Sequence, residues 1–273
     1  MTTAARTALP FDLGHVDART APEVIAEILA GEHRGRIIGN LNLHGLYMAQ
    51  TDEHFHRFCE QADTVLIDGW PILALARGTS TTSPLTPEHR IGSTDWLFPL
   101  IENDEPLVVV AVGGTAESSA AAAEDVGART TRMTWLAYDG FDQRWRGCGE
   151  EQPLTESLAR ADLVLVGMGM PRQERWILEH RALAPRAAFA NVGGCLDYLA
   201  GTQTLAPRWM GALGVEWLFR LARDPRRLAA RYLLEPLQLL RIVLSGRKRS
   251  KRAPDPCDTA RSTGRLSTGA TPR

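Results

Sequence analysis

The chain has 273 residues, of which 44% are hydrophobic and 23% are charged, and its formal net charge is −1. These values are typical of a globular protein with one large or two small domains, and a chain of this length buries about three quarters of its unfolded surface. Because the charge is close to zero, no overall field attracts nucleic acid, and we expect no nucleic-acid partner.

The cysteines and the apolar runs indicate a compartment. The four cysteines are scattered and form no CxxC pair, which favours a reducing compartment and argues against a structural zinc site. The amino-terminal segment has no long apolar core, and no run reaches about 18 apolar residues. We therefore expect neither a signal peptide nor a membrane span, and a cytoplasmic protein.

The first predicted elements are a helix over residues 22–29 and a short strand over 36–38. This strand runs into Asn40 and Asn42, which alternate with apolar neighbours. Both could face one cleft at the strand end and offer amide donors and acceptors. Alternatively they cap the helix predicted over residues 44–62, which is the interpretation that local sequence favours.

A second buried strand is predicted over residues 64–67 and stops at Asp68. Asp followed by Gly is most often only a turn. A carboxylate at the carboxyl end of a parallel strand is nevertheless placed where α/β enzymes keep catalytic groups. The polar segment 84–95 follows and contains Arg90, so it is either a solvated loop or a cationic lid over a phosphate.

The clearest strand is predicted over residues 106–112 and opens onto Gly113 and Gly114, followed by an alanine-rich helix. A dinucleotide fold would place GxGxxG in this turn and an acidic residue about 20 positions later. The turn reads GGTAES instead, and the strand predicted over 132–136 carries no carboxylate. The chain also lacks GxxxxGK[ST], so neither a dehydrogenase nor a P-loop nucleotidase is favoured.

The central stretch is ADLVLVGMGMPRQERW, residues 161–176. It predicts a strand covered on both faces, a turn at Gly167 and Gly169, and a helix start that carries Gln173. Such a turn favours an anion such as phosphate, although many α/β proteins keep glycine there for packing.

One more strand, over residues 187–192, leads to Asp197. At least four strands thus end in Gly or Asp at one presumed edge. The sequence predicts an α/β fold, a Rossmann-like parallel sheet with flanking helices, over residues 1–205.

The carboxyl-terminal part has a different character. Residues 206–252 predict a helical appendage whose last helix has leucines on one side and is followed by a basic run without carboxylates. Such a segment is either membrane-associating or docked on the sheet with a solvated basic end. Residues 253–273 are rich in Pro, Ser, Thr and Gly and are predicted to be disordered.

Several blocks spread over most of the chain point to one family. They are, in order, NLN, LIDGWPI, HRIGSTD, VGGT, VGMGMPRQERW, NVGGCLDYLAG and APRWMGALGVEWLFRLARDPRRLAARY. Over residues 37–232 the chain resembles the WecG/TagA/CpsF glycosyltransferase family, and the PxQE and EWxxRL blocks are its specific features.

This resemblance implies an activity. The family transfers a sugar, such as N-acetylmannosamine or a related hexose, from a UDP-sugar donor to a polyprenyl diphosphate-linked saccharide. Transfer proceeds with inversion, without a metal or another cofactor, at the inner face of the bacterial plasma membrane. The products serve wall teichoic acids, enterobacterial common antigen or exopolysaccharides.

The resemblance also assigns roles to residues. Asp68 matches the base that takes the proton of the acceptor hydroxyl, a role that requires a raised pKa at neutral pH. Asn40 and Asn42 lie near donor sugar and diphosphate, and Gln173 matches the glutamine that touches the transferring sugar. Asp197 matches the carboxylate that holds the uridine.

Arginines replace the metal in this scheme, because guanidinium groups bind diphosphates through paired hydrogen bonds. The residues concerned are Arg90, Arg220, Arg227 and Arg231. Two departures from the family pattern, Leu205 and Ala230, stand where arginine is usual. Either could weaken a phosphate contact and allow an altered acceptor.

The family further implies an appendage that closes over the active site at the membrane, and a homo-oligomer when the appendage is undocked. Two alternatives stay open from sequence. One is a nucleotide-binding oxidoreductase of Rossmann type, and the other is an inactive membrane-associated scaffold of the same fold.

Overall fold

The computed structural model describes residues 6–80, 84–141 and 153–245, without the side chains of Arg208, Ala212 and Arg227. The basic run after residue 245 and the tail predicted over 253–273 lie outside the described residues.

Within the described residues, six parallel strands form one sheet in the order β4-β3-β8-β7-β5-β6. This confirms the predicted parallel α/β architecture. The strands are β3 (Ile37–Leu41), β4 (Thr64–Ile67), β5 (Val108–Gly113), β6 (Thr134–Tyr138), β7 (Leu163–Gly167) and β8 (Ala188–Asn191).

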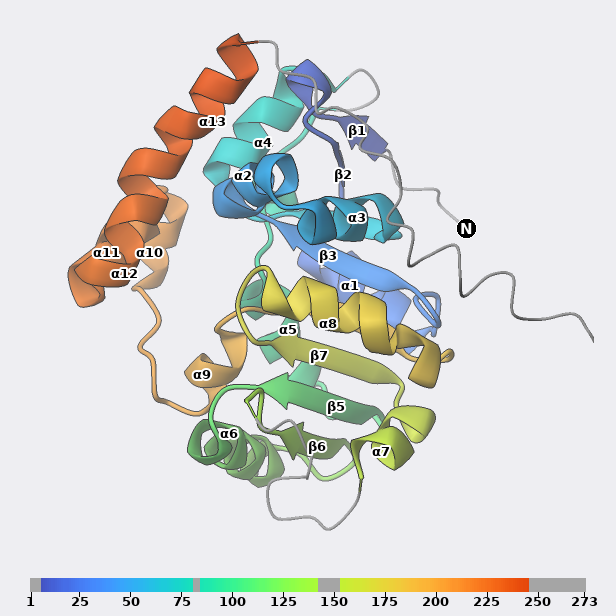
Figure 1. The fold of residues 1–273 in the computed structure, drawn as a ribbon. Coiled ribbons are helices and arrows are strands. Elements are labelled where there is room, and N and C mark those ends of the chain that lie inside the picture. Colours follow the sequence, from blue (N-terminus) through green and yellow to red (C-terminus); the bar gives the residue numbers. More distant parts are fainter. Residues whose placement is uncertain (1–5, 81–83, 142–152, 246–273) are drawn as a thin grey trace, which may run out of the picture.

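Helices cover both faces of the sheet (Figure 1). One face carries α2 (Leu43–Thr51), α3 (Glu53–Gln61), α4 (Trp70–Arg77), α7 (Leu154–Arg160) and α8 (Arg172–His180). The other carries α1 (Ala21–Leu29), α5 (Ser93–Glu102), α6 (Ala116–Arg129) and α9 (Cys195–Leu199).

The apolar residues of β7 explain why the sheet needs two covers. Val164 and Val166 belong to the first apolar cluster, whereas Leu163 and Leu165 belong to the second. Successive side chains of a strand point to opposite faces, so a continuous apolar run must be buried on both. The expectation of a strand covered on both faces is confirmed.

A short antiparallel pair, β1 (Arg6–Ala8) and β2 (His15–Asp17), precedes the sheet and was not expected from sequence. It is tied to β4 because the Asp17 carboxylate accepts a hydrogen bond from the backbone N–H of Val65 at 2.8 Å.

Two predicted boundaries were wrong. The helix expected over residues 44–62 is two helices, because Asp52 has an extended backbone and its carboxylate accepts the Phe55 N–H at 2.8 Å. The strand expected over 132–136 begins at Thr134, because the N–H groups of Arg132 and Met133 donate to Asp104 instead.

In the part of the chain that the structure describes, further α-helices follow the sheet and lie beyond the carboxyl ends of the strands (Figure 1), and a π-helix, Ala230–Leu234, joins the last two. The α-helices are α10 (Arg208–Ala212), α11 (Glu216–Arg223), α12 (Pro225–Ala229) and α13 (Glu235–Leu244). Helix α13 packs beside α2, and Leu239 reaches the first apolar cluster. None of the helices in the described part of the chain is long and apolar enough to cross a bilayer.

Candidate active site

The parallel strands β3 and β8 are followed by connections to opposite faces of the sheet. Their ladder pairs only Ile37 with Phe189 and Ile38 with Ala190. Beyond these pairs, the chain after β3 enters α2 on one face and the chain after β8 enters α9 on the other. In open α/β sheets, ligands bind at the carboxyl edge where neighbouring strands diverge in this way. We call the turns that follow β3, β7 and β8 the switch region.

Asp68 directly follows β4, at the same edge. Asn42 donates from Nδ2 to Asp68 Oδ2 at 3.1 Å, while its own Oδ1 accepts the Gly45 N–H and caps α2. The capping interpretation of Asn42 is therefore confirmed, and the same side chain also orients Asp68. A Cβ at Gly92 would lie 3.1 Å from Asp68 Oδ1, so the start of α5 closes the other side of the carboxylate.

The surroundings of Asp68 set its proton affinity. Burial raises the pKa of Asp68, while Arg220 and the Asn42 hydrogen bond act in the opposite direction. As a whole residue, Asp68 is half-buried. Arg220 comes from α11 and lies with its Cζ 5.9 Å from the ring centroid of Tyr198. The appendage thus brings a cation to the Asp68 side of the sheet.

Asn40 occupies a different place from the one expected. It lies inside β3, is 5% exposed and does not cap α2. Its backbone N–H donates to Asn191 Oδ1 at 2.7 Å, and its Nδ2 donates to the Asn191 carbonyl oxygen at 2.7 Å. The capping interpretation of Asn40 was wrong, because the side chain bridges two strands that stop pairing through their backbones.

Gln173 is 1% exposed and lies in the first turn of α8. Its Oε1 accepts the Gly193 N–H at 3.2 Å, and its Nε2 donates to Glu174 Oε1 at 2.6 Å. Glu174 also accepts from Asn191 Nδ2 at 2.7 Å. Burial raises the pKa of Glu174 to about 7, against hydrogen bonds from Asn191 and Gln173 that favour the anion.

The glycine turns bring peptide groups into direct contact. A Cβ at Gly113 would stand 2.4 Å from the carbonyl oxygen of Gly167, and one at Gly167 would stand 2.7 Å from that of Gly193. Gly114 and Gly169 have φ values of 71° and 76°, the left-handed region that favours glycine. Gly167 therefore packs closely, as the packing interpretation expects, whereas a Cβ at Gly169 would meet nothing within 4 Å. A phosphate at these turns stays a prediction.

Asp197 lies at the start of α9, beside the turn after β5. Ser118 Oγ donates to its Oδ1 at 2.9 Å, and Gln203 Nε2 donates to its Oδ2 at 3.0 Å. Gly114 is close, because a Cβ there would lie 3.6 Å from Asp197 Oδ1. The carboxylate is thus oriented at the edge of the sheet, and its role toward uridine stays a prediction.

The remaining predicted cations lie near the same edge. Arg90 forms an isolated parallel bridge with Ile67 and lies with its Cζ 5.5 Å from the ring centroid of Trp70. Trp70 Nε1 in turn donates to the Gly211 carbonyl oxygen at 2.9 Å and so contacts α10. Arg231 stacks over Tyr232 with its Cζ 5.8 Å from the ring centroid.

Three other sequence features remain as expectations. The side chain of Arg227 lies outside the described residues. Leu205 is exposed, in the segment that connects the sheet to α10, and Ala230 is exposed after α12.

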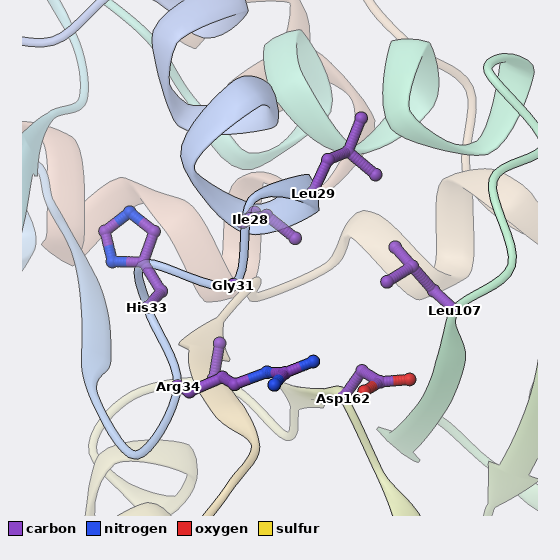
Figure 2. A pocket seen from close by; sticks show the side chains of 8 residues that line it. Ile28, Leu29, Gly31, His33, Arg34, Leu107 and Asp162 are labelled. Carbon is purple, nitrogen blue, oxygen red and sulfur yellow. The ribbon is translucent and has the colours of Figure 1, made fainter.

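A hollow of about 30 Å³ lies away from these residues (Figure 2). Leu107 and Asp162 in its wall precede β5 and β7, so it is at the amino ends of the strands. Its lining residues are Ile28, Leu29, Gly31, His33, Arg34, Leu107, Asp162 and Ala188. This volume accommodates little more than a water molecule, and we assign it no role in the reaction.

Sequence reasoning gave no role to Asn191 or Glu174. Glu174 could have been found, because it precedes Ile177 by three residues, as Gln173 precedes Trp176, a spacing that places each pair on one face of α8. A polar pair on an apolar helix face indicates a buried hydrogen-bond network. Asn191 carries no such signal, because its partner Asn40 is 151 residues away.

The comparisons with known proteins agree with the fold. The sequence model of the family described as "Glycosyl transferase WecG/TagA/CpsF family" matches residues 7–253. Among curated proteins, the chain is similar to the N-acetylglucosaminyldiphosphoundecaprenol N-acetyl-beta-D-mannosaminyltransferase of Bacillus subtilis (strain 168). The two are 25% identical over 198 residues, which cover 71% of this chain and 73% of that protein.

A protein of the same name from Staphylococcus aureus (strain MW2) is 25% identical over 207 residues, covering 74% of this chain and 78% of its own. The family model spans more than half of the chain, so the resemblance noted in the sequence blocks is confirmed, and with it the expectation of a sugar-transferring enzyme. The chain therefore belongs to the WecG/TagA/CpsF family of glycosyl transferases.

Proposed function

We propose that this chain is an inverting, metal-independent hexosyltransferase that moves a sugar of the N-acetylmannosamine type, or a related hexose, from a UDP donor. The acceptor is a polyprenyl diphosphate-linked saccharide used in cell-wall or surface polysaccharide synthesis. Two relatives are named for transfer of an N-acetylmannosaminyl group to N-acetylglucosaminyldiphosphoundecaprenol, which supports the sugar and acceptor classes. Family membership also favours sugar transfer over the oxidoreductase alternative.

The observation that carries this proposal is the setting of Asp68. It lies at a strand end, is held by Asn42 at 3.1 Å, and its pKa is raised by burial. In a single displacement the acceptor oxygen attacks the anomeric carbon, the bond from that carbon to the diphosphate oxygen breaks, and the acceptor proton passes to Asp68. The products are the new glycoside, UDP and a proton that Asp68 later releases.

The leaving diphosphate carries charge that the protein must stabilise. Arg220 lies close enough to Asp68 to lower the pKa of that carboxyl group. Arg90 pairs with Ile67, the last residue of β4, directly before Asp68. Guanidinium groups and backbone N–H groups at helix starts can hold a diphosphate without a metal ion. In this proposal Arg220 and Arg231 complete the site only when the appendage is docked.

The proposal places the protein at the inner face of the plasma membrane. The appendage exposes large apolar side chains, which is typical of a surface that binds a partner or a bilayer. They include Trp209, Leu213, Trp217, Leu218, Leu237, Leu240 and Leu244. A lipid-linked acceptor would then reach the site from the membrane to which these side chains bind.

The direct test is to incubate the full chain with a panel of UDP-sugars and a polyprenyl diphosphate-linked amino sugar, and to measure UDP release. We expect one donor to be consumed, a product of inverted anomeric configuration by NMR, and no loss of rate with EDTA. Absence of release with every donor would support the inactive scaffold instead. Stabilisation of the fold by NAD but not by UDP would favour the oxidoreductase.

A further inference from the structure

Glu174 is a buried carboxyl group that the proposed mechanism does not use. Its side chain is 0% exposed, and no arginine or lysine pairs with it in the part of the chain that the structure describes. A buried ionisable group without a counter-charge is costly, so its presence on an apolar helix face calls for a compensating role.

The first partner of Glu174 has a fixed orientation. The backbone N–H of Asn40 donates to Asn191 Oδ1 at 2.7 Å, and a backbone N–H can only donate. The Nδ2 end of Asn191 must therefore point the other way, where it donates to Glu174 Oε1 at 2.7 Å. This chain of bonds connects the end of β3 to Glu174.

The second partner is fixed by the same reasoning. The backbone N–H of Gly193 donates to Gln173 Oε1 at 3.2 Å, so the Nε2 end of Gln173 is turned toward Glu174 Oε1 at 2.6 Å. Both amide chains begin at a backbone N–H group and end at the same oxygen atom. That oxygen consequently connects β3, the end of β8, the turn after β8 and the first turn of α8.

We propose that Glu174 is a positioning residue for sugar transfer, whose single oxygen Oε1 holds the carboxyl ends of β3 and β8, the turn at Gly193 and the start of α8 in one mutual arrangement. The backbone pairing of β3 and β8 stops at Ile38 and Ala190, so side chains must hold the strand ends together beyond that point. Only the kinetic consequence of this inference rests on the proposed function.

The protonation of Glu174 is compatible with this role. The groups that face it from other elements are Cys59 of α3, Asp52 at the start of α3 and Asn191 of β8, and Gln173 lies beside it on α8. Oxygen Oε2 accepts no hydrogen bond among the described residues, so one protonated oxygen leaves Oε1 free to accept from both amides. Glutamine has the same shape and keeps an acceptor oxygen, so it should preserve the arrangement.

The test compares Glu174→Ala, Glu174→Gln and Ile177→Ala in the full chain. Ile177 is fully buried one turn along α8 and outside the hydrogen-bond network. Ile177→Ala therefore controls for the loss of stability that truncating a buried side chain of α8 causes. We expect Glu174→Ala to lower kcat about 100-fold with a smaller change in KM, because misplaced groups at a reacting centre cost roughly this factor. Glu174→Gln and Ile177→Ala should stay within about threefold of wild type.

A second measurement does not depend on turnover. The side-chain amide signals of Gln173 and Asn191 and the backbone amide signal of Gly193 should shift and exchange faster in Glu174→Ala, but not in the other two variants. If the wild type transfers no sugar, these signals alone decide the inference, and only the proposed function fails. Unchanged signals in Glu174→Ala would overturn the inference, as would an equal kcat loss in Ile177→Ala.

Discussion

Asp68 and Glu174 show how surroundings give two carboxyl groups different chemistry. Burial raises the pKa of both. Asp68 has Arg220 nearby, and in the proposed mechanism it takes a proton from the acceptor hydroxyl and releases it again. Glu174 is fully buried and its Oε1 accepts hydrogen bonds from the amides of Gln173 and Asn191, so in our inference this oxygen holds those two side chains in place. Their environments, not their residue type, separate a base from a positioning group.

The first prediction concerns the base. Asp68→Asn keeps the size of the side chain but removes the proton acceptor, and we expect kcat to fall about 100- to 10,000-fold. In the wild type, burial raises the pKa of Asp68, so the rate should decline with falling pH at a higher pH than for an ordinary carboxyl group. The residual rate of Asp68→Asn should lack this decline. UDP release over a range of pH measures both effects.

Binding supplies the control for this variant. Asn42 and Arg220 remain in place, so titration calorimetry should give a similar UDP affinity for wild type and Asp68→Asn. An Asp68→Asn protein that transfers sugar at the normal rate would remove Asp68 from the mechanism.

The second prediction concerns stability. The folded state raises the pKa of Glu174 from 4.5 to about 7, so between these values it binds more protons than the unfolded state. The free energy of unfolding should therefore fall as pH rises through this window. Relative to Glu174→Gln, which does not titrate, the wild type should lose on the order of 3 kcal/mol. Urea unfolding of both proteins at several pH values tests this, and parallel curves would contradict it.

At the scale of the element, the sequence predicts strands better than the contacts between them. The continuous apolar run of β7 and the glycine after it predict a buried strand and its turn, because both signals are local. The break at Asp52 and the start of β6 at Thr134 depend on side-chain caps, and one of these caps comes from Asp104. A contact with a distant residue has no local pattern.

The candidate site follows the same division. That Asn42 and Asp68 end adjacent strands could be predicted from the order of motifs, and the 3.1 Å hydrogen bond between them is consistent with this. The connection of Asn40 to Asn191 could not, because it requires knowing that β8 lies beside β3. The burial of Glu174 could be predicted from the helix pattern, since Glu174 and Ile177 are three residues apart and both are buried.

The third prediction concerns the glycine turns. Gly167→Ala should lower the free energy of unfolding by about 1–3 kcal/mol, because its Cβ would lie 2.7 Å from the carbonyl oxygen of Gly193 and force the turns apart. Gly127→Ala is the matched control, since a Cβ at this helix position meets nothing within 4 Å. It should stabilise the protein by about 0.5–1 kcal/mol. Equal effects of the two substitutions on urea unfolding would contradict the steric argument.

At the scale of the whole molecule, side chains of the sheet domain contact the appendage at several places. Trp70 donates to the Gly211 carbonyl oxygen at 2.9 Å, and His44 Nδ1 lies 2.5 Å from Glu235 Oε2. Arg220 then lies over Tyr198, next to Asp197. The appendage and the sheet therefore share the edge at which the proposed reaction takes place.

The fourth prediction concerns removal of the appendage. Truncation after Ala206 removes α10 to α13 and should leave a folded protein by circular dichroism, since both apolar clusters consist almost entirely of earlier residues. Transfer to a lipid-linked acceptor should be nearly lost, because Arg220 and Arg231 are gone. Flotation with vesicles of anionic phospholipid should show binding of the full chain and not of the truncated one. Retained transfer by the truncated protein would contradict the proposed role of the appendage.

The contacts between peptide groups at Gly113, Gly167 and Gly193 restrict how this enzyme can diversify. Mutation replaces side chains and leaves peptide groups unchanged, and Gly113 and Gly167 have no room for an added methyl group. If the proposed function holds, a descendant adapted to another donor would inherit these two glycines as they are. A preference for the new donor would have to arise from substitutions of flanking side chains such as Trp70 and Arg90.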